Sequence, residues 1–197
     1  MTDPSASGGT SPGLAAGRTV SQPVTHLVVM GVAGCGKTTT ANGLARVLGW
    51  PVAEADDFHP GANIAKMRAG TPLTDADRWP WLDSLRGWMS ERAAQGSSTI
   101  VTCSALKRSY RDLLAQAQGR VRFVHLQVQE VELRRRMAQR EGHFMPASLL
   151  PSQLATLEPL EDDEDGVVVV SGSSSPEATV TAVLESLELL DVEAGRC

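Results

Sequence analysis

The 197-residue chain is long enough for one domain with a full hydrophobic core. Its composition, 42% hydrophobic and 21% charged, excludes a protein that is disordered throughout. A net charge of -5 argues against nucleic acid as the main partner, and no apolar run approaches the roughly 20 residues that cross a membrane. Three cysteines without metal-ligand spacing, together with the lack of a secretory signal, predict a protein of the reducing cytoplasm.

The chain divides into a tail, one domain and a short end. Residues 1–23 are mainly Gly, Ser, Pro, Thr and Ala, which predicts a disordered tail because such a segment buries too little apolar surface. We expect the domain over residues 24–190 and a frayed end over 191–197. Five apolar runs predict buried strands, within residues 24–30, 50–55, 98–103, 121–128 and 166–171.

Helical spacing of apolar residues fills the gaps between these strands. It predicts helices over 41–48, closed by Gly49, over 81–94 behind Pro80, and over 130–141. Strands that are apolar on both faces and alternate with helices indicate a parallel sheet covered on both sides. The run from Glu158 to Asp165 holds six acidic residues in eight positions, which we interpret as a solvated loop.

The segment GVAGCGKT follows the first predicted strand and matches the G-x-x-x-x-G-K-[ST] phosphate-loop pattern. Glycines let the backbone turn around an anion with its N–H groups pointing inward, and the next helix adds its positive N-terminus. Lys37 would bind the β- and γ-phosphates of ATP, and Thr38 would offer its hydroxyl to Mg²⁺. The residues expected to bind the nucleotide are Gly31, Val32, Ala33, Gly34, Cys35, Gly36, Lys37, Thr38 and Thr39.

The rest of the sequence narrows the class of phosphate-loop protein. The third predicted strand is followed by SALK and lacks the Asp that motor ATPases use to hold Mg²⁺. The Asn-Lys-x-Asp motif with which GTPases bind guanine is also absent from the sequence. A small kinase remains, in which substrate lies at the carboxyl ends of the strands. There the second strand ends in EADDFHP, where Asp56, or else Asp57, could accept a hydroxyl proton. Capping of the following turn is the structural alternative for either Asp, and His59 is a candidate substrate ligand.

Cations near two other predicted strands are further candidates. Lys107 and Arg111 follow the third strand, where donors suit a polyhydroxy acid or its carboxylate. In the helix from Glu130, helical phase places Arg136 and Arg140 near the buried face and turns Arg134 and Arg135 toward solvent. An inward cation needs an anionic partner, either a nucleotide phosphate or an internal carboxylate.

Taken together, these segments resemble the thermoresistant, phosphate-loop type of the gluconokinase family. The matching segments, in family order from about residue 26 to 187, are MGVAGCGKTT, ADDFHPGANIAKMRAGTPLTDADRWPWL, CSALKRSYRDLL, REGHFMPASLLPSQLATLEPLE and SGSSSPEATV. Departures include Glu54, where the family usually has Asp, and Cys35, where it usually has Ser.

The resemblance implies transfer of the ATP γ-phosphoryl group to O6 of D-gluconate by a cytoplasmic homodimer. It implies a fold like nucleoside monophosphate kinases, with a five-stranded parallel sheet of order 2-3-1-4-5, a substrate-binding insertion and a lid at about residues 141–153. Lys37, Asp56, Arg136 and Arg140 would then be catalytic. The candidates for binding the substrate carboxylate are Lys66, Arg68, Lys107 and Arg111. A further candidate for binding substrate is His143 in the lid. A kinase of another small sugar acid or polyol, shikimate-kinase-like, and a non-catalytic nucleotide-binding regulator remain as alternatives.

Overall fold

The computed structural model describes residues 23–139, 147–172 and 175–189. Its strands are β1 (Thr25–Met30), β2 (Val52–Glu54), β3 (Thr99–Cys103), β4 (Arg120–Gln127) and β5 (Gly166–Val170). Its α-helices are α1 (Lys37–Leu48), α2 (Gly61–Arg68), α3 (Asp75–Ala94), α4 (Arg108–Leu114), α5 (Glu130–Ala138), α6 (Leu150–Thr156) and α7 (Pro176–Ser186). Two 3₁₀ turns, η1 (Ala55–Phe58) and η2 (Ala147–Leu149), precede α2 and α6.

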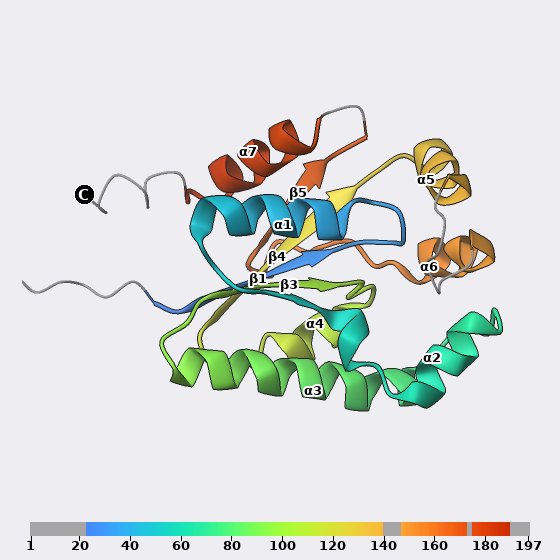
Figure 1. The fold of residues 1–197 in the computed structure, drawn as a ribbon, viewed down its shortest axis with the longest axis horizontal. Helices are drawn as coiled ribbons and strands as arrows, with labels where there is room; N and C mark the ends of the chain where they lie inside the picture. The colour runs from blue at the N-terminus through green and yellow to red at the C-terminus, as the bar shows by residue number, and fades with distance from the viewer. Residues whose placement is uncertain (1–22, 140–146, 173–174, 190–197) are drawn as a thin grey trace, which may run out of the picture.

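The five strands form one parallel sheet in the order β2-β3-β1-β4-β5, as the resemblance implied. Helices α1 and α7 cover one face of the sheet, and α3 and α4 cover the other (Figure 1). Alternate residues of β1 serve the two faces: Leu27 and Val29 belong to the core under α1 and α7, whereas Val28 and Met30 belong to the core over α3. This explains why the strand is apolar at every position, since both of its faces are buried.

One helix begins a turn and a half earlier than the sequence predicts. The expected start at residue 81 is wrong, because α3 begins at Asp75 with Thr74 as its N-cap. The Thr74 hydroxyl accepts a hydrogen bond from the Asp77 amide, and the Asp77 carboxylate accepts one from the Thr74 amide. This reciprocal capping box starts the helix, and Pro80 is accommodated within it at the cost of one backbone hydrogen bond.

The acidic run before β5 forms a loop with five of its six acidic residues exposed, as predicted, but its carboxylates also have partners within the fold. Basic side chains of α4 and β4 bind four of its carboxylates, in the pairs Arg108–Glu161, Arg108–Asp163, Arg111–Glu164, Arg120–Asp165 and Arg122–Asp165. The run therefore folds back over α4 and β4. Its partners lie more than 40 positions away in sequence, so a local charge pattern could not identify them.

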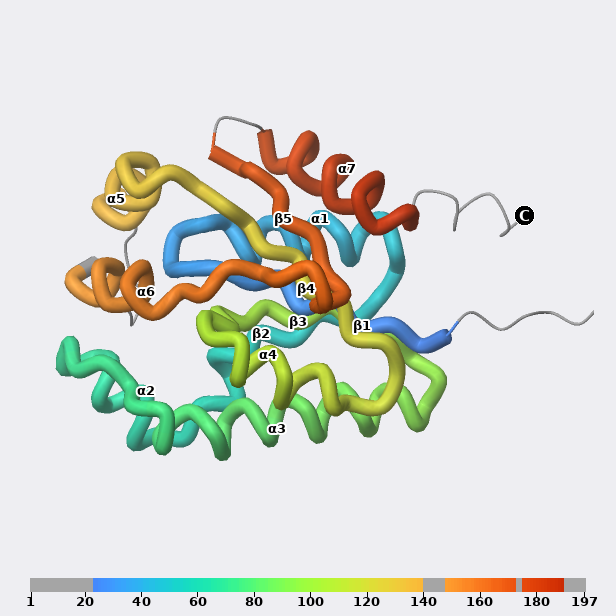
Figure 2. The backbone as a smooth tube through the Cα atoms, turned by 180° about the vertical axis from the view of Figure 1, so that it is seen from behind, coloured from blue at the N-terminus to red at the C-terminus, as the bar shows by residue number. Residues whose placement is uncertain are grey.

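The chain places its shorter elements at one end of the sheet. In both views, α2, α5 and α6 gather around the end toward which the strands point (Figures 1 and 2). Carboxyl ends of parallel strands are where ligands bind in open α/β sheets. The expected tail over 1–23, apart from Pro23, and the frayed end over 191–197 lie outside the described residues, as do residues 140–146 of the expected lid. Within the described part of the chain, no helix is long and apolar enough to cross a membrane.

Candidate active site

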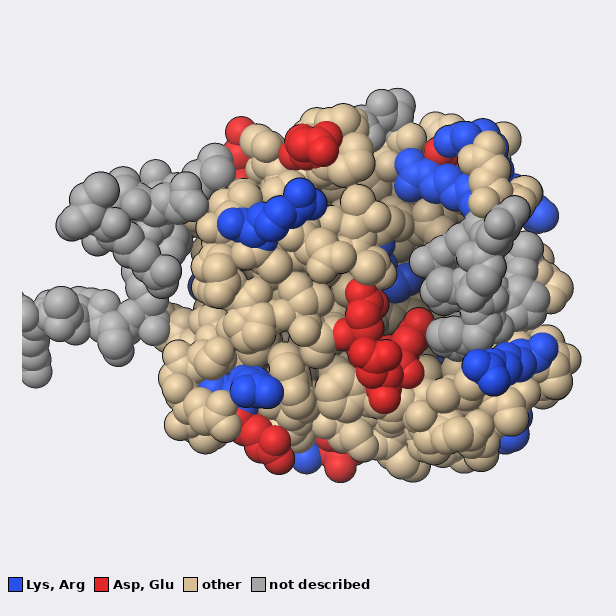
Figure 3. Space-filling view, in the orientation of Figure 1, with Lys and Arg blue, Asp and Glu red and all other residues tan. Residues whose placement is uncertain are grey.

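A cleft of about 500 Å³ opens at the carboxyl ends of the strands. Residues of the phosphate loop, the ends of β2 and β3, and helices α2, α3, α5 and α6 line it. Figure 3 shows this face of the molecule hollowed, with acidic side chains at the rim and a basic side chain within the hollow. The cleft therefore joins elements that are far apart in sequence into one site.

The phosphate loop connects β1 to α1 in a conformation that requires glycine. Gly31, Gly34 and Gly36 have φ angles of 133°, 82° and 102°, in the region that side chains disfavour. A Cβ on Gly31 would also lie 3.0 Å from the Leu126 carbonyl oxygen. Gly36 is the N-cap of α1, so the loop delivers its backbone to the positive end of a 12-residue helix.

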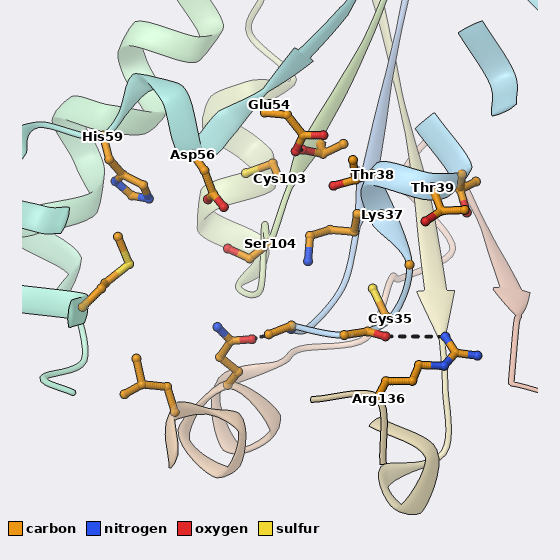
Figure 4. Close-up of a pocket in the computed structure, with 18 of the residues that line it drawn as sticks. Cys35, Lys37, Thr38, Thr39, Glu54, Asp56, His59, Cys103, Ser104 and Arg136 are labelled. Carbon is orange, nitrogen blue, oxygen red and sulfur yellow. Dashed lines mark hydrogen bonds between the residues drawn. The ribbon is translucent and has the colours of Figure 1, made fainter. Parts of the chain in front are cut away.

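Lys37 lies at the first position of α1 and turns its amine back over the loop. Its Nζ donates to the carbonyl oxygens of Gly31 at 3.0 Å and Val32 at 3.1 Å. In Figure 4, Lys37 points into the same space as Asp56 and Ser104. A cation held there can bind phosphoryl oxygens on one side while facing a carboxylate on the other.

A side chain from α6 completes the loop. The Ala33 amide donates to Oε1 of Gln153 at 2.7 Å, and Gln153 is buried. This contact links the phosphate loop to the helix that follows residues 140–146. The sequence alone does not predict a role for Gln153, because a single amide side chain after a turn matches no nucleotide-binding pattern.

Thr38 and Thr39 follow Lys37 and line the cleft. Glu54, at the end of β2, accepts a hydrogen bond from the Thr102 hydroxyl, and Figure 4 shows it on the same side of the cleft as Thr38. Within the described ranges no group of three His, Cys, Asp or Glu residues could hold a metal ion. The Thr38 hydroxyl remains the predicted protein ligand for Mg²⁺, an ion that keeps several waters and binds mainly through nucleotide phosphates.

The structure separates the two candidate bases. Both lie in η1, but Asp56 lines the cleft, whereas Asp57 is exposed and lines a separate hollow beside Phe58 and Trp88. Asp56 therefore has the position that a proton acceptor requires. Asp57 does not have this position, because it lies on a different surface of the molecule.

His59 lines the cleft in a neutral form. Its ring stacks on Trp81 with centroids 4.1 Å apart, and its Nδ1 lies 3.4 Å from Nδ2 of Asn63. Burial, together with the positive charge of Arg78, lowers the His59 pKa to about 4. At neutral pH this imidazole can therefore exchange hydrogen bonds with a hydroxyl without carrying a charge.

Three of the four cations proposed from the sequence for the substrate carboxylate belong to helix ends outside the cleft. Lys66 pairs with Asp77 at 2.6 Å, and Lys107 pairs with Asp75 at 2.8 Å. Arg68, at the end of α2, is exposed and does not line the cleft. Each of the two lysines already has a carboxylate partner that anchors the start of α3.

Arg111, the fourth candidate, lies on α4 and is buried. Its guanidinium pairs with Glu164 at 2.5 Å and donates to the carbonyl oxygens of Ala105, Glu158 and Pro159. Its side chain is 0% exposed, so it cannot reach a ligand. The structure thus contradicts the proposed contact of Arg111 with substrate and makes this residue an anchor for the acidic run.

The structure brings a different cation, Arg78, into the cleft. Arg78 lies on α3, three residues before Trp81 and four before Leu82, both of which are buried. Helical spacing could have revealed it, because residues three and four apart share a face. A helix that starts at residue 81, as predicted from Pro80, does not include Arg78, so this spacing is not apparent from the sequence.

On α5, the expected division of the arginines holds for the three that the structure describes. Arg134 and Arg135 are exposed and pair with Glu130 and Glu132. Arg136 lines the cleft and is more buried, with 29% of its side chain exposed. Arg140 and His143 lie outside the described residues.

Arg136 has the internal carboxylate partner that was one of the two alternatives for an inward arginine, and the nucleotide phosphate remains a prediction. Its Nε donates to Glu132 at 2.7 Å, the internal carboxylate alternative. Its other nitrogens reach the carbonyl oxygens of Gly34 at 3.5 Å, Ser171 at 3.3 Å and Gly172 at 3.2 Å. Figure 4 shows this guanidinium against the phosphate loop. Arg136 therefore joins the loop to the segment between β5 and α7.

Comparisons with known proteins identify the family of the chain. A family model described as an AAA domain matches residues 27–160. A gluconokinase of Gluconobacter oxydans (strain 621H) is 52% identical over 165 residues, covering 84% of this chain and 92% of that protein. The chain belongs to the gluconokinase family. Among solved structures, a gluconokinase from Sinorhizobium meliloti 1021 is 42% identical with a TM-score of 0.74, covering 86% of this chain and 95% of that one.

A second solved structure has a higher TM-score to this chain. An unliganded sugar kinase from Janibacter sp. HTCC2649 is 54% identical with a TM-score of 0.82, covering 86% of this chain and 98% of that one. Both solved structures thus share the fold of this chain over most of its length.

Proposed function

We propose that this protein transfers the γ-phosphoryl group of ATP to O6 of D-gluconate, giving 6-phospho-D-gluconate and ADP. The observation that carries the proposal is the meeting of Lys37 and Asp56 in one cleft, in a chain of the gluconokinase family. A phosphate loop supplies the nucleotide half of such a site, and a carboxylate at the end of the neighbouring strand supplies the acceptor half. No described feature favours a sugar acid other than gluconate or a non-catalytic role.

In the proposed reaction the 6-hydroxyl oxygen of gluconate attacks the γ-phosphorus of ATP. The new P–O bond forms as the bond from the γ-phosphorus to the β–γ bridging oxygen breaks, and ADP leaves with that oxygen. The hydroxyl proton passes to the carboxylate of Asp56. Lys37 and the loop amides stabilise the charge on the phosphoryl oxygens, and Arg136 holds the Gly34 end of the loop in place.

Mg²⁺, bound with the nucleotide, would neutralise phosphate charge and hold the β- and γ-oxygens in position. The Thr38 hydroxyl is the protein ligand that we propose for it. Glu54, whose carboxylate is oriented by Thr102, lies on the same side of the cleft. Residues 140–146, with Arg140 and His143, remain predicted members of the lid, and the homodimer and the cytoplasmic location remain predictions.

A substrate panel tests the proposal. Purified protein is supplied with ATP, Mg²⁺ and, in turn, gluconate, other aldonic acids, glucose and shikimate, and ADP release is followed at initial rate. We expect gluconate to be preferred over glucose by at least about a hundredfold in kcat/KM. Comparable rates with glucose, or a faster rate with another acid, would overturn the substrate assignment.

A further inference from the structure

We propose that Arg78 is the residue that binds the carboxylate of the sugar acid and so determines specificity at the acceptor end of the cleft. This inference rests on the proposed function, because it names the group that recognises the proposed substrate. Three described cations line the cleft, namely Lys37, Arg78 and Arg136. Lys37 and Arg136 are both bonded to the phosphate loop, which leaves Arg78 for an acceptor.

Arg78 lies in the part of the cleft where we place the phosphoryl acceptor. His59 and Trp81 line the same pocket, and the charge of Arg78 acts on the His59 ring. His59 itself is neutral at neutral pH, so it can contact hydroxyl groups but cannot balance a carboxylate. Arg78 is therefore the described cation on this wall that can pair with an acid.

The guanidinium is oriented by a chain of hydrogen bonds rather than by a carboxylate. Its Nη1 donates to the Tyr110 hydroxyl at 3.1 Å, and that hydroxyl donates to Asp75 at 2.6 Å. Lys107 binds the same Asp75 at 2.8 Å, so the aspartate charge is already matched. No carboxylate among the described residues forms an ion pair with Arg78, unlike Lys66, Lys107 and Arg111.

This arrangement suits a ligand carboxylate. The described residues provide an acceptor for Nη1 but none for Nε or Nη2, so one edge of the guanidinium keeps two parallel donors. Two parallel N–H groups match the two oxygens of a carboxylate, which a lysine amine cannot do. Tyr110 fixes the plane of the guanidinium in advance, and this reduces the entropy lost when the acid binds.

The test compares gluconate with glucitol, a polyol of the same length that has a hydroxymethyl group in place of the carboxylate. The variants are Arg78→Gln and Arg78→Lys, with Arg86→Gln as matched control, because Arg86 lies on the same helix and pairs with Asp83 away from the cleft. For each protein, Kd for both ligands is measured by calorimetry, alongside kcat and KM and the thermal midpoint.

We expect Arg78→Gln to raise Kd and KM for gluconate at least about tenfold while leaving KM for ATP and Kd for glucitol within about twofold. Arg78→Lys keeps the charge without the paired donors, so its loss falls between those of wild type and Arg78→Gln. Tyr110→Phe removes the orienting hydroxyl and produces a smaller rise in KM for gluconate in the same direction. Arg86→Gln matches wild type.

Equal losses for gluconate and glucitol in Arg78→Gln, or an unchanged Kd for gluconate, would overturn the role of Arg78. Either result leaves the proposed function standing if wild type phosphorylates gluconate. Failure of wild type to phosphorylate gluconate would overturn the proposed function, and the binding data would still decide whether Arg78 reads a carboxylate.

Discussion

The buried guanidinium of Arg111 donates two hydrogen bonds to the carboxylate of Glu164, from Nε at 2.5 Å and from Nη2 at 2.9 Å. Both side chains are almost completely removed from solvent, at 0% and 5% exposed. The pair fixes the segment before β5 to α4. Charges buried in this way are costly to separate, because either one left alone has no water to replace its partner.

Glu164→Gln should therefore destabilise the fold by about 3–5 kcal/mol, because it leaves the Arg111 charge buried without a counter-charge. Asp163→Asn is the matched control: Asp163 belongs to the same segment and binds Arg108, but 67% of its side chain is exposed. For that variant we expect a change of about 1 kcal/mol or less. Denaturant unfolding measures both, and equal effects would refute the anchoring role of Glu164.

The same pair predicts a pH dependence of stability. Burial raises the Glu164 pKa, but the hydrogen bonds and charge of Arg111 outweigh it and leave the pKa below its usual range. A lowered pKa in the folded state means that the stabilisation is complete above the unfolded pKa and is lost as the pH falls through the folded one. The stability difference between wild type and Glu164→Gln should thus shrink on acidification. A constant difference from neutral to acid pH would contradict this.

His59 predicts a second pH dependence of stability, over a different pH range. Its folded pKa of about 4 lies below the ordinary value of 6.5, so the unfolded chain binds the proton first. Because folded His59 stays neutral while the unfolded chain takes up the proton, the free energy of unfolding of wild type should fall by up to about 3 kcal/mol between about pH 6.5 and about pH 4. His59→Gln keeps a neutral hydrogen-bonding group and removes this loss. Unfolding curves that fall in parallel for the two proteins would show that His59 is not held neutral.

The two adjacent aspartates should differ in catalysis. Asp56→Asn keeps the size and polarity of the side chain but removes the proton acceptor, so kcat should fall at least about a hundredfold with little change in KM for ATP. Asp57→Asn should stay within about twofold of wild type, because Asp57 is exposed outside the cleft. Initial-rate kinetics distinguish them. Greater sensitivity at Asp57 would place the base one residue later.

Arg136 and Arg134 make a similar matched pair on one helix. Arg136→Ala removes the bonds to the Gly34, Ser171 and Gly172 carbonyl oxygens, so we expect kcat/KM to fall at least about tenfold. Arg134→Ala should have an effect of less than about twofold, because 60% of that side chain is exposed. Equal losses at both positions would mean that helical phase does not predict function here.

Much of the fold could be predicted from local patterns. Strands β1 and β3 are buried at every position, as their apolar runs predict. The fifth apolar run also predicts a buried strand, but β5 is an edge strand with Val168 and Val170 exposed. The order of the sheet follows from the family that the motifs resemble. The phosphate loop is predictable because its glycines and Lys37 are consecutive. Asp56 could be placed near the cleft because the ends of neighbouring parallel strands meet at one edge.

The cations of the acceptor half could not be predicted in the same way. A sequence shows that Lys107 and Arg111 are charged, but not that Asp75 and Glu164 have already bound them. These partners lie more than 30 positions away, and only the folded chain brings them together. Arg78 is different, because the reason is local: Pro80 predicts a helix start at residue 81, whereas the capping box of Thr74 starts the helix before Arg78.

The most direct measurement of the central claim is the product itself. Wild-type protein is incubated with ATP, Mg²⁺ and D-gluconate, and the product is analysed by ³¹P and ¹³C nuclear magnetic resonance while ADP is counted. We expect one phosphate ester on carbon 6 for each ADP formed, and we expect Lys37→Ala, which removes the cation on the γ-phosphoryl group, to abolish the signal. ADP that forms without a phosphate ester, or an ester that forms at an unchanged rate in Lys37→Ala, would contradict the claim.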